Sequence, residues 1–174
     1  MGAALIALAL LAVPLAATAE RAAPWTDAFR REPVGTEILG VPVASIDADW
    51  RRASPLEAAE LDAAQRADMK RRELAFVANG DFNDDGHPDR AIVGTFGDRH
   101  GKTGRFVAIF TQYANRWTRA FRETVDGEPG FGALSVDASP LGRLRWSTCL
   151  ACMPVGEIAW SGQNWFLVPA EPGR

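Results

Sequence analysis

Residues 105–124, RFVAIFTQYANRWTRAFRET, decide the fold class of this chain. β-Branched and aromatic residues fill two runs, and Ala114-Asn115 between them supplies the short turn that joins antiparallel strands. The five residues from Phe106 to Phe110 are all apolar, so a strand there is covered on both faces, either as a central strand or beneath a helix. The stretch therefore predicts a β-hairpin inside a sheet.

The same strand-like pattern begins at Leu74 and continues through the rest of the chain, broken at short intervals by Gly, Asn, Asp and Pro. Turns are expected at Asp126-Gly127, at Pro140-Leu141-Gly142 and at residues 161–164. Because consecutive strands usually pair, we expect a mainly β fold, an antiparallel meander or sandwich of about eight strands. The predicted strands are 74–79, 90–96, 105–113, 116–124, 132–137, 143–148, 155–160 and 164–168.

One N-terminal helix is predicted before this sheet. Ser54-Pro55-Leu56-Glu57 has the form of a capping box, in which Ser54 and Glu57 satisfy free backbone N–H groups and Pro55 sits where no donor is needed. Good helix formers follow, with apolar residues at a spacing near 3.6. We therefore expect a helix at about 55–72, within segment 54–73.

The region before the helix shows no sustained period. Residues 20–53 are rich in Ala, Arg and Pro, which predicts an irregular N-terminal arm, and residues 54–174 are expected to form a single domain. The arm is expected to pack through Trp25, Phe29, Ile38, Val41, Val43 and Trp50.

Composition limits the classes of partner. The chain has 174 residues, of which 47% are hydrophobic, enough for one well-filled core. Its formal net charge is −3, and Lys and Arg are scattered rather than clustered, so no basic surface is available for a phosphate backbone. We expect no nucleic-acid partner.

The N-terminus has the form of a secretory signal peptide. Residues 5–17 are apolar without interruption and end at Ala17-Thr18-Ala19, a small-x-small cleavage pattern. We expect residues 1–19 to be removed after Ala19, which places the protein in the periplasm or outside the cell with no membrane attachment. An uncleaved anchor is the alternative, although the apolar run is short for a span of about 20 residues.

One motif carries recognisable chemistry. Oxygen-bearing side chains occupy positions 1, 3, 5 and 9 of the loop 81–89, namely Asp81, Asn83, Asp85 and Asp89, with a glycine at position 6. Calcium takes about six to eight oxygen ligands, and alternate residues of a tight loop point inward to supply them. The carbonyl oxygen of His87 at position 7 can complete the shell. This predicts a Ca²⁺ site, and an acidic β-turn without metal is the alternative.

The loop resembles those of FG-GAP repeats, the integrin-type and VCBS-type secreted β-repeats. In that family a D-x-[DN]-x-[DN]-G-x-x-D loop joins two antiparallel strands around Ca²⁺, and here the resemblance covers a single copy at about residues 76–97. It implies that Asp81, Asn83, Asp85, Asp89 and the His87 carbonyl hold the metal. A propeller repeats the loop in every blade, so one copy in a chain of this length excludes a closed propeller.

The remaining motifs are weaker. Cys149 and Cys152 are expected to form a disulfide, with a redox dithiol or half a zinc site as alternatives. The loop around His100 resembles a phosphate-binding loop but lacks its first glycine, so we interpret it as a hairpin turn. Strand tryptophans are core residues by default, and a sugar-binding platform is the alternative.

These observations favour a non-catalytic, exported calcium-binding β-domain with a structural or partner-binding role, the partner being an unidentified protein or glycan. The alternative is a small exported hydrolase whose site lies near the calcium loop and uses Asp84, His100 or an unidentified acid. No complete nucleophile or acid–base set is visible in the sequence to support catalysis.

Overall fold

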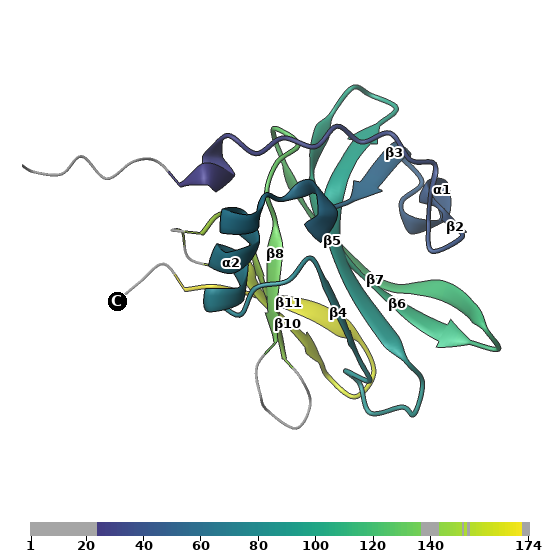
Figure 1. Cartoon of the computed structure of the whole chain (residues 1–174). Helices are drawn as coiled ribbons and strands as arrows, with labels where there is room; N and C mark the ends of the chain where they lie inside the picture. The colour runs from purple at the N-terminus through teal and green to yellow at the C-terminus, as the bar shows by residue number, and fades with distance from the viewer. Residues whose placement is uncertain (1–23, 137–142, 151, 153, 172–174) are drawn as a thin grey trace, which may run out of the picture.

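Two large antiparallel sheets face each other and form the body of the fold, and a third sheet of two strands lies in the N-terminal region (Figure 1). The computed structural model describes residues 24–136, 143–150, 152 and 154–171. Within them the predicted class, a mainly β antiparallel fold without a closed propeller, is confirmed. The expected signal peptide, residues 1–19, and the expected turn at Pro140-Leu141-Gly142 lie outside the described residues.

The first sheet has five strands. Its order is β3 (Trp50–Pro55), β5 (Asp89–Asp98), β6 (Thr103–Tyr113) and β7 (Arg116–Asp126). Strand β4 (Val77–Gly80) pairs with the first half of β5, and β3 pairs with the second half. Because β6 holds the opposite edge of β5, β3 and β4 share one edge.

The second sheet has four strands in sequence order. They are β8 (Ala133–Val136), β9 (Leu144–Ser147), β10 (Gly156–Trp160) and β11 (Trp165–Pro169). The eight predicted strands thus correspond to β4–β11. The predicted Ala114-Asn115 turn is confirmed, with both residues at positive φ (46° and 65°) as a two-residue hairpin of matching twist requires.

Strand β6 is apolar on both faces because it separates two cores. Val107 and Ile109 face the second sheet in a core that also contains the fully buried Trp146. Phe106, Ala108 and Phe110 face the other way, into a smaller core with Trp50. The interpretation of 106–110 as a doubly covered strand is confirmed, and the cover on its second face is the N-terminal region.

The predicted helix at about 55–72 is wrong in its first part. Ser54 and Pro55 end strand β3, and the Ser54 hydroxyl accepts a hydrogen bond from the Val34 backbone N–H (2.9 Å) instead of capping a helix. A short 3₁₀ turn, η2 (Ala58–Glu60), follows, and helix α2 spans only Ala63–Arg71. Strand pairing with β5 satisfies the backbone of residues 50–55, and this tertiary contact overrides the local capping pattern.

The real cap of helix α2 lies further along the chain. The Asp62 side chain accepts from the Gln65 backbone N–H (2.8 Å), and the Gln65 side chain accepts from the Asp62 N–H (2.9 Å). This is a complete capping box with Asp and Gln in the two roles. It fixes the start of the helix at Ala63.

The N-terminal arm is more regular than predicted. It contains η1 (Trp25–Asp27), a small hairpin of β1 (Glu37–Ile38) and β2 (Val41–Pro42), and helix α1 (Val43–Ile46), and β3 crosses residue 53, where the arm was expected to end. Ile38, Val41, Val43 and Trp50 are buried, as expected. Apolar burial on the outer face of the first sheet therefore orders the arm.

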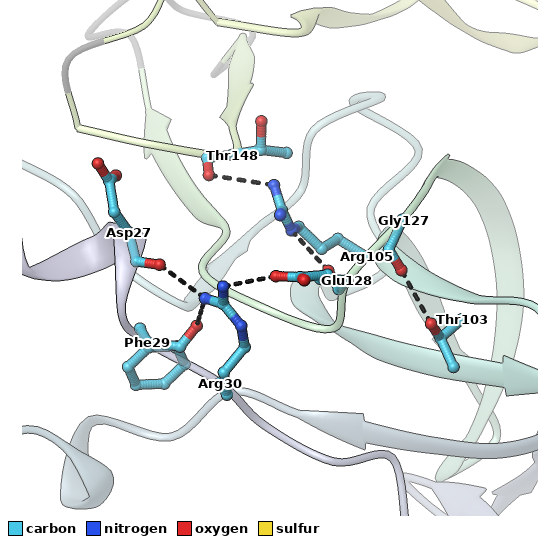
Figure 2. A network of polar contacts seen from close by, with 8 residues as sticks. All are labelled: Asp27, Phe29, Arg30, Thr103, Arg105, Gly127, Glu128 and Thr148. Atoms are coloured by element: carbon cyan, nitrogen blue, oxygen red, sulfur yellow. Dashed lines mark hydrogen bonds and ion pairs between the residues drawn. The ribbon is translucent and has the colours of Figure 1, made fainter.

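A polar network fastens the first part of the arm to the sheets (Figure 2). Arg30 donates to the carbonyl oxygens of Asp27 (2.7 Å) and Phe29 (2.9 Å) and forms an ion pair with Glu128. Arg105 donates to the carbonyls of Glu128 (3.2 Å) and Thr148 (3.4 Å), and burial lowers the pKa of its guanidinium. The network joins the arm, the β7–β8 connection and the end of β9.

Helix α2 is tied to the arm separately. The Trp25 indole N–H donates to the Asp68 carboxylate (3.1 Å), and this bond, with those from Arg72 and the charge of Arg71, lowers the pKa of Asp68.

None of the helices in the described residues is long and apolar enough to cross a bilayer. Cys149 and Cys152 form a disulfide with a Cα–Cα distance of 5.6 Å, as predicted, and a disulfide indicates an oxidising, exported compartment.

Candidate metal site

The candidate loop 81–89 connects β4 to β5. Gly80 and Asp89 are the last paired residues of this hairpin, so the loop is held at one end of the first sheet. Gly86 has φ +80° and Asp84 has φ +57°, the left-handed conformations that allow a short chain to fold back on itself. Glycine is therefore required at position 6 by the turn, as the motif predicts.

Asp81 closes the loop. Its carboxylate accepts hydrogen bonds from the backbone N–H groups of Asp85 (3.1 Å) and Gly86 (2.9 Å). Two consecutive backbone N–H groups of the loop are thus anchored on the Asp81 carboxylate. Local hydrogen bonds of this kind are the usual means by which Asp organises an irregular segment.

Asn83 and Asp85 join Asp81 inside the loop. The Asn83 side-chain oxygen lies 3.3 Å from the same Asp85 N–H that Asp81 accepts, and the Asn83 amide donates to Asp85 (2.9 Å). Desolvation opposes ionisation of Asp85, but hydrogen bonds from the His87 backbone N–H and from Asn83 outweigh it and lower its pKa. Three predicted ligand side chains are therefore gathered at one place.

Asp89 plays a different part from the other three. It is 1% exposed, and its two oxygens accept from the Thr111 hydroxyl (2.6 Å) and the Phe82 backbone N–H (3.0 Å). Burial raises its pKa, and the charges of Asp85 and Asp81 add to the effect. Asp89 joins the loop to strand β6, while the Phe82 side chain enters the core between the sheets as expected.

His87 is expected to contribute its carbonyl oxygen. Its backbone N–H donates to Asp85 (2.8 Å), and its imidazole ring packs on Tyr113 with the ring centroids 4.4 Å apart. The Tyr113 hydroxyl in turn donates to Asp85 (3.3 Å). The imidazole is thus used for packing, which leaves the carbonyl as the atom that the motif assigns to a metal.

The fit to calcium is partial. Oxygens of Asp81, Asn83 and Asp85 converge, and these are hard ligands of the type that calcium prefers. Within the described residues, however, no three His, Cys, Asp or Glu side chains gather at metal-binding spacing, and the Asp89 carboxylate accepts from the Thr111 hydroxyl. Both Asp89 oxygens already accept a hydrogen bond. An ion bound by Asp81, Asn83 and Asp85 would therefore have Asp89 as a ligand only if one of these oxygens also contacted the ion.

Comparisons with protein-family models, with curated proteins and with solved structures found no match for this chain. The resemblance to FG-GAP repeats therefore depends on the loop and its two strands.

Asp84 and His100, the two alternative candidates for a hydrolase site, lie at opposite ends of strand β5. Asp84 precedes β5 and His100 follows it, and ten strand residues at about 3.3 Å each separate them by roughly 30 Å. Asp98 accepts from the backbone N–H of His100 (2.8 Å), and the His100 ring accepts from Arg99 (3.1 Å). The arrangement is that of a closed hairpin turn, which supports the interpretation of this loop.

Sequence reasoning missed Thr111 and Tyr113. They contact Asp89 and Asp85 from 22 and 28 residues away, across the pairing of β5 with β6. The available signal is that strand 105–113 is apolar from Phe106 to Phe110 and then turns polar at its end nearest the loop.

Proposed function

We propose that this protein is an exported, non-catalytic calcium-binding β-domain of the FG-GAP/VCBS type, in which the ion fixes the β4–β5 hairpin. The observation that carries the proposal is the convergence of Asp81, Asn83 and Asp85 oxygens on one loop whose backbone is already closed. A preorganised loop needs little rearrangement to bind an ion, which favours binding.

The charge of the loop supports this proposal. Four carboxylates lie within nine residues, and in the described chain no Lys or Arg forms an ion pair with any of them. Several acidic groups elsewhere are paired with arginine, as in Asp47–Arg122 (2.7 Å) and Asp49–Arg99 (2.6 Å). Like charges at this spacing repel unless a cation lies among them.

The expected environment agrees with a calcium role. The disulfide indicates an oxidising compartment, and we propose that a signal peptide cleaved after Ala19 delivers the chain to the periplasm or the cell exterior. Calcium is plentiful outside the cytoplasm. A structural ion can therefore be permanently bound there.

The test is thermal unfolding of the exported protein in excess CaCl₂ and in EGTA. A ligand at 100 times its Kd that binds only the folded state adds about 2.7 kcal/mol. For a domain of this size the melting temperature should rise by several degrees. The Asp81→Ala, Asp85→Ala double variant should lose the rise, because it lacks two of the three converging side chains.

Asp98→Ala is the matched control. Asp98 also closes a turn at one end of β5, but residues 98–102 contain no other carboxylate, and the nearby Asp49 and Asp126 form ion pairs with Arg99 and Lys102. This variant should keep the full calcium response. A wild-type melting temperature identical in CaCl₂ and EGTA would contradict the proposal, and so would a calcium rise retained by the double variant.

A further inference from the structure

An open cleft of about 440 Å³ lies beside the candidate metal loop. One wall contains Asn83 and Asp85 from the loop, and the other is formed by the β10–β11 hairpin. Figure 1 shows the tip of that hairpin close to the β4–β5 loop. The volume falls within the range of about 300–1,000 Å³ usual for sites that bind small molecules.

The cleft is the place where the core between the sheets ends. Along the inner face of β6, the buried Val107 and Ile109 are followed by Thr111 and Tyr113, and Tyr113 is 45% exposed. On β10 the buried Ile158 is followed by Trp160. The inward-facing side chains of β6 and β10 thus fill the core along most of each strand, and they are polar or aromatic at the end of each strand that lies at the cleft.

Aromatic rings supply the apolar part of the cleft. Trp160 and Trp165 are cross-strand partners, their ring centroids are 5.3 Å apart, and the angle between their planes is 55°. Both are only half-buried, and Tyr113 lies in the same cleft. Flat, partly exposed rings at the mouth of a cleft offer apolar faces to a ligand, whereas core tryptophans such as Trp146 are fully enclosed.

The polar side chains of the cleft carry uncharged amides, the hydroxyls of Thr111 and Tyr113, and one carboxylate. The side-chain amides of Gln163 and Asn164 hydrogen-bond to no other described residue, and Asp85 and Asn83 face them from the loop. Among the residues that the structure describes, no Lys, Arg or His lines the cleft. With no ion in the loop, an anionic ligand would meet Asp85 without a compensating cation, whereas a neutral ligand suits this lining with or without the ion.

We infer that this cleft binds a neutral carbohydrate. The apolar C–H face of a pyranose ring packs on Trp160 and Trp165, while its hydroxyls, each both donor and acceptor, pair with the amides of Gln163 and Asn164 and with Asp85. The inference rests on the proposed function in one respect. Asn83 and Asp85 belong to both sites, so an ion in the loop holds them in place for the sugar.

The experiment measures tryptophan fluorescence and titration calorimetry of the exported protein with four neutral trisaccharides, maltotriose, cellotriose, mannotriose and triacetylchitotriose. In saturating CaCl₂ at least one should quench the fluorescence and bind with a measurable Kd. Trp160→Ala and Gln163→Ala should each weaken that binding tenfold or more. Phe166→Ala is the control, since Phe166 is 42% exposed on β11 and points to the opposite face from Trp165.

The outcomes separate this inference from the calcium proposal. A calcium-dependent rise in melting temperature without binding of any trisaccharide contradicts the carbohydrate site and leaves the metal site standing. Equal binding by wild type, Trp160→Ala and Gln163→Ala, with all three folded by circular dichroism, also contradicts the carbohydrate site. Binding that the two variants lose but EGTA does not change supports the cleft and contradicts the role given to the ion.

Discussion

The two turns at the ends of strand β5 close in the same way but carry different charges. At one end Asp81 accepts from the backbone N–H groups of Asp85 and Gly86, and at the other Asp98 accepts from those of His100 and Lys102 (2.8 Å each). Each turn has a glycine at positive φ, Gly86 at +80° and Gly101 at +83°. In both, one aspartate organises the backbone.

The surroundings of the two aspartates differ. The Asp98 turn contains one carboxylate with Arg99 and Lys102, which form ion pairs with Asp49 and Asp126. The loop 81–89 contains four carboxylates and no basic residue other than His87. The comparison teaches that an aspartate closes a turn by accepting hydrogen bonds from backbone N–H groups, while a concentration of uncompensated oxygens is what suits a turn to a cation.

The largest expected difference between the turns comes from Phe82. It is 5% exposed and packs in the core between the sheets, so Phe82→Ala should lower the free energy of unfolding by about 3–5 kcal/mol. His100→Ala, at an exposed position of the other turn, should change it by less than about 0.5 kcal/mol. Urea unfolding measures both, and a similar value for the two variants would show that the loop 81–89 is not anchored in the core.

The next largest effect is expected at Asp89. Asp89→Ala leaves the buried Thr111 hydroxyl and Phe82 N–H without an acceptor, which should cost about 1–3 kcal/mol. Thr111→Val removes the hydroxyl donor, so that no buried hydroxyl at residue 111 is left without an acceptor when Asp89 is also replaced. The double variant should therefore be less destabilised than the sum of the single variants, and strict additivity in a urea double-mutant cycle would contradict the link.

The two glycines should be equally sensitive. A Cβ at Gly86 or Gly101 would meet no atom within 4 Å, so substitution by alanine costs only the left-handed backbone conformation. Each variant should lose about 1–2 kcal/mol in EGTA. If Gly86→Ala lowers the free energy of unfolding clearly more than Gly101→Ala does, the left-handed conformation at residue 86 is not the whole cost, and loop 81–89 carries additional strain.

The smallest effects are expected in the pH dependence, where the two turns should differ in sign. Burial raises the pKa of Asp89 in the folded protein. Its favourable contribution to the free energy of unfolding is therefore complete below the ordinary pKa of about 3.9 and is lost as the pH rises through the raised pKa of the folded state. For Asp98, desolvation is outweighed by the N–H groups of Lys102 and His100, and the pKa is lowered. Its contribution is present above about pH 3.9 and is lost as pH falls.

Melting temperatures in EGTA between pH 3 and 7 test this difference. The gap between wild type and Asp89→Asn should shift against the wild type as pH rises, whereas the gap for Asp98→Asn should shift in its favour. If the two gaps in melting temperature changed in the same direction with pH, the opposite pKa shifts of Asp89 and Asp98 would be contradicted.

The strands and the loop were readable from the sequence because their signals are local. Alternation, the Ala114-Asn115 turn and the position-6 glycine depend on residues a few positions apart, and β4–β11 follow the predicted order. The inward Phe82 and the Cys149–Cys152 disulfide were predictable for the same reason.

The capping pattern at Ser54 shows where local reading fails. Ser54 and Glu57 have the right residue types for a helix start, but pairing of β3 with β5 places Ser54 in a strand, 2% exposed. A contact some 40 residues away along the chain decided between two locally acceptable structures, and helix α2 begins instead at Ala63, with Asp62 as its N-cap.

By itself the sequence determined the β class, the order of the strands and an acidic loop with calcium-type spacing, since periodicity and turn chemistry act over a few residues. Only the tertiary structure decided that Asp89 is turned toward Thr111 and that Trp160, Trp165 and Tyr113 share a cleft with Asp85. Those neighbours come together because the register of β5 on β6 and the packing of one sheet on the other place them there, and no short stretch of sequence encodes either.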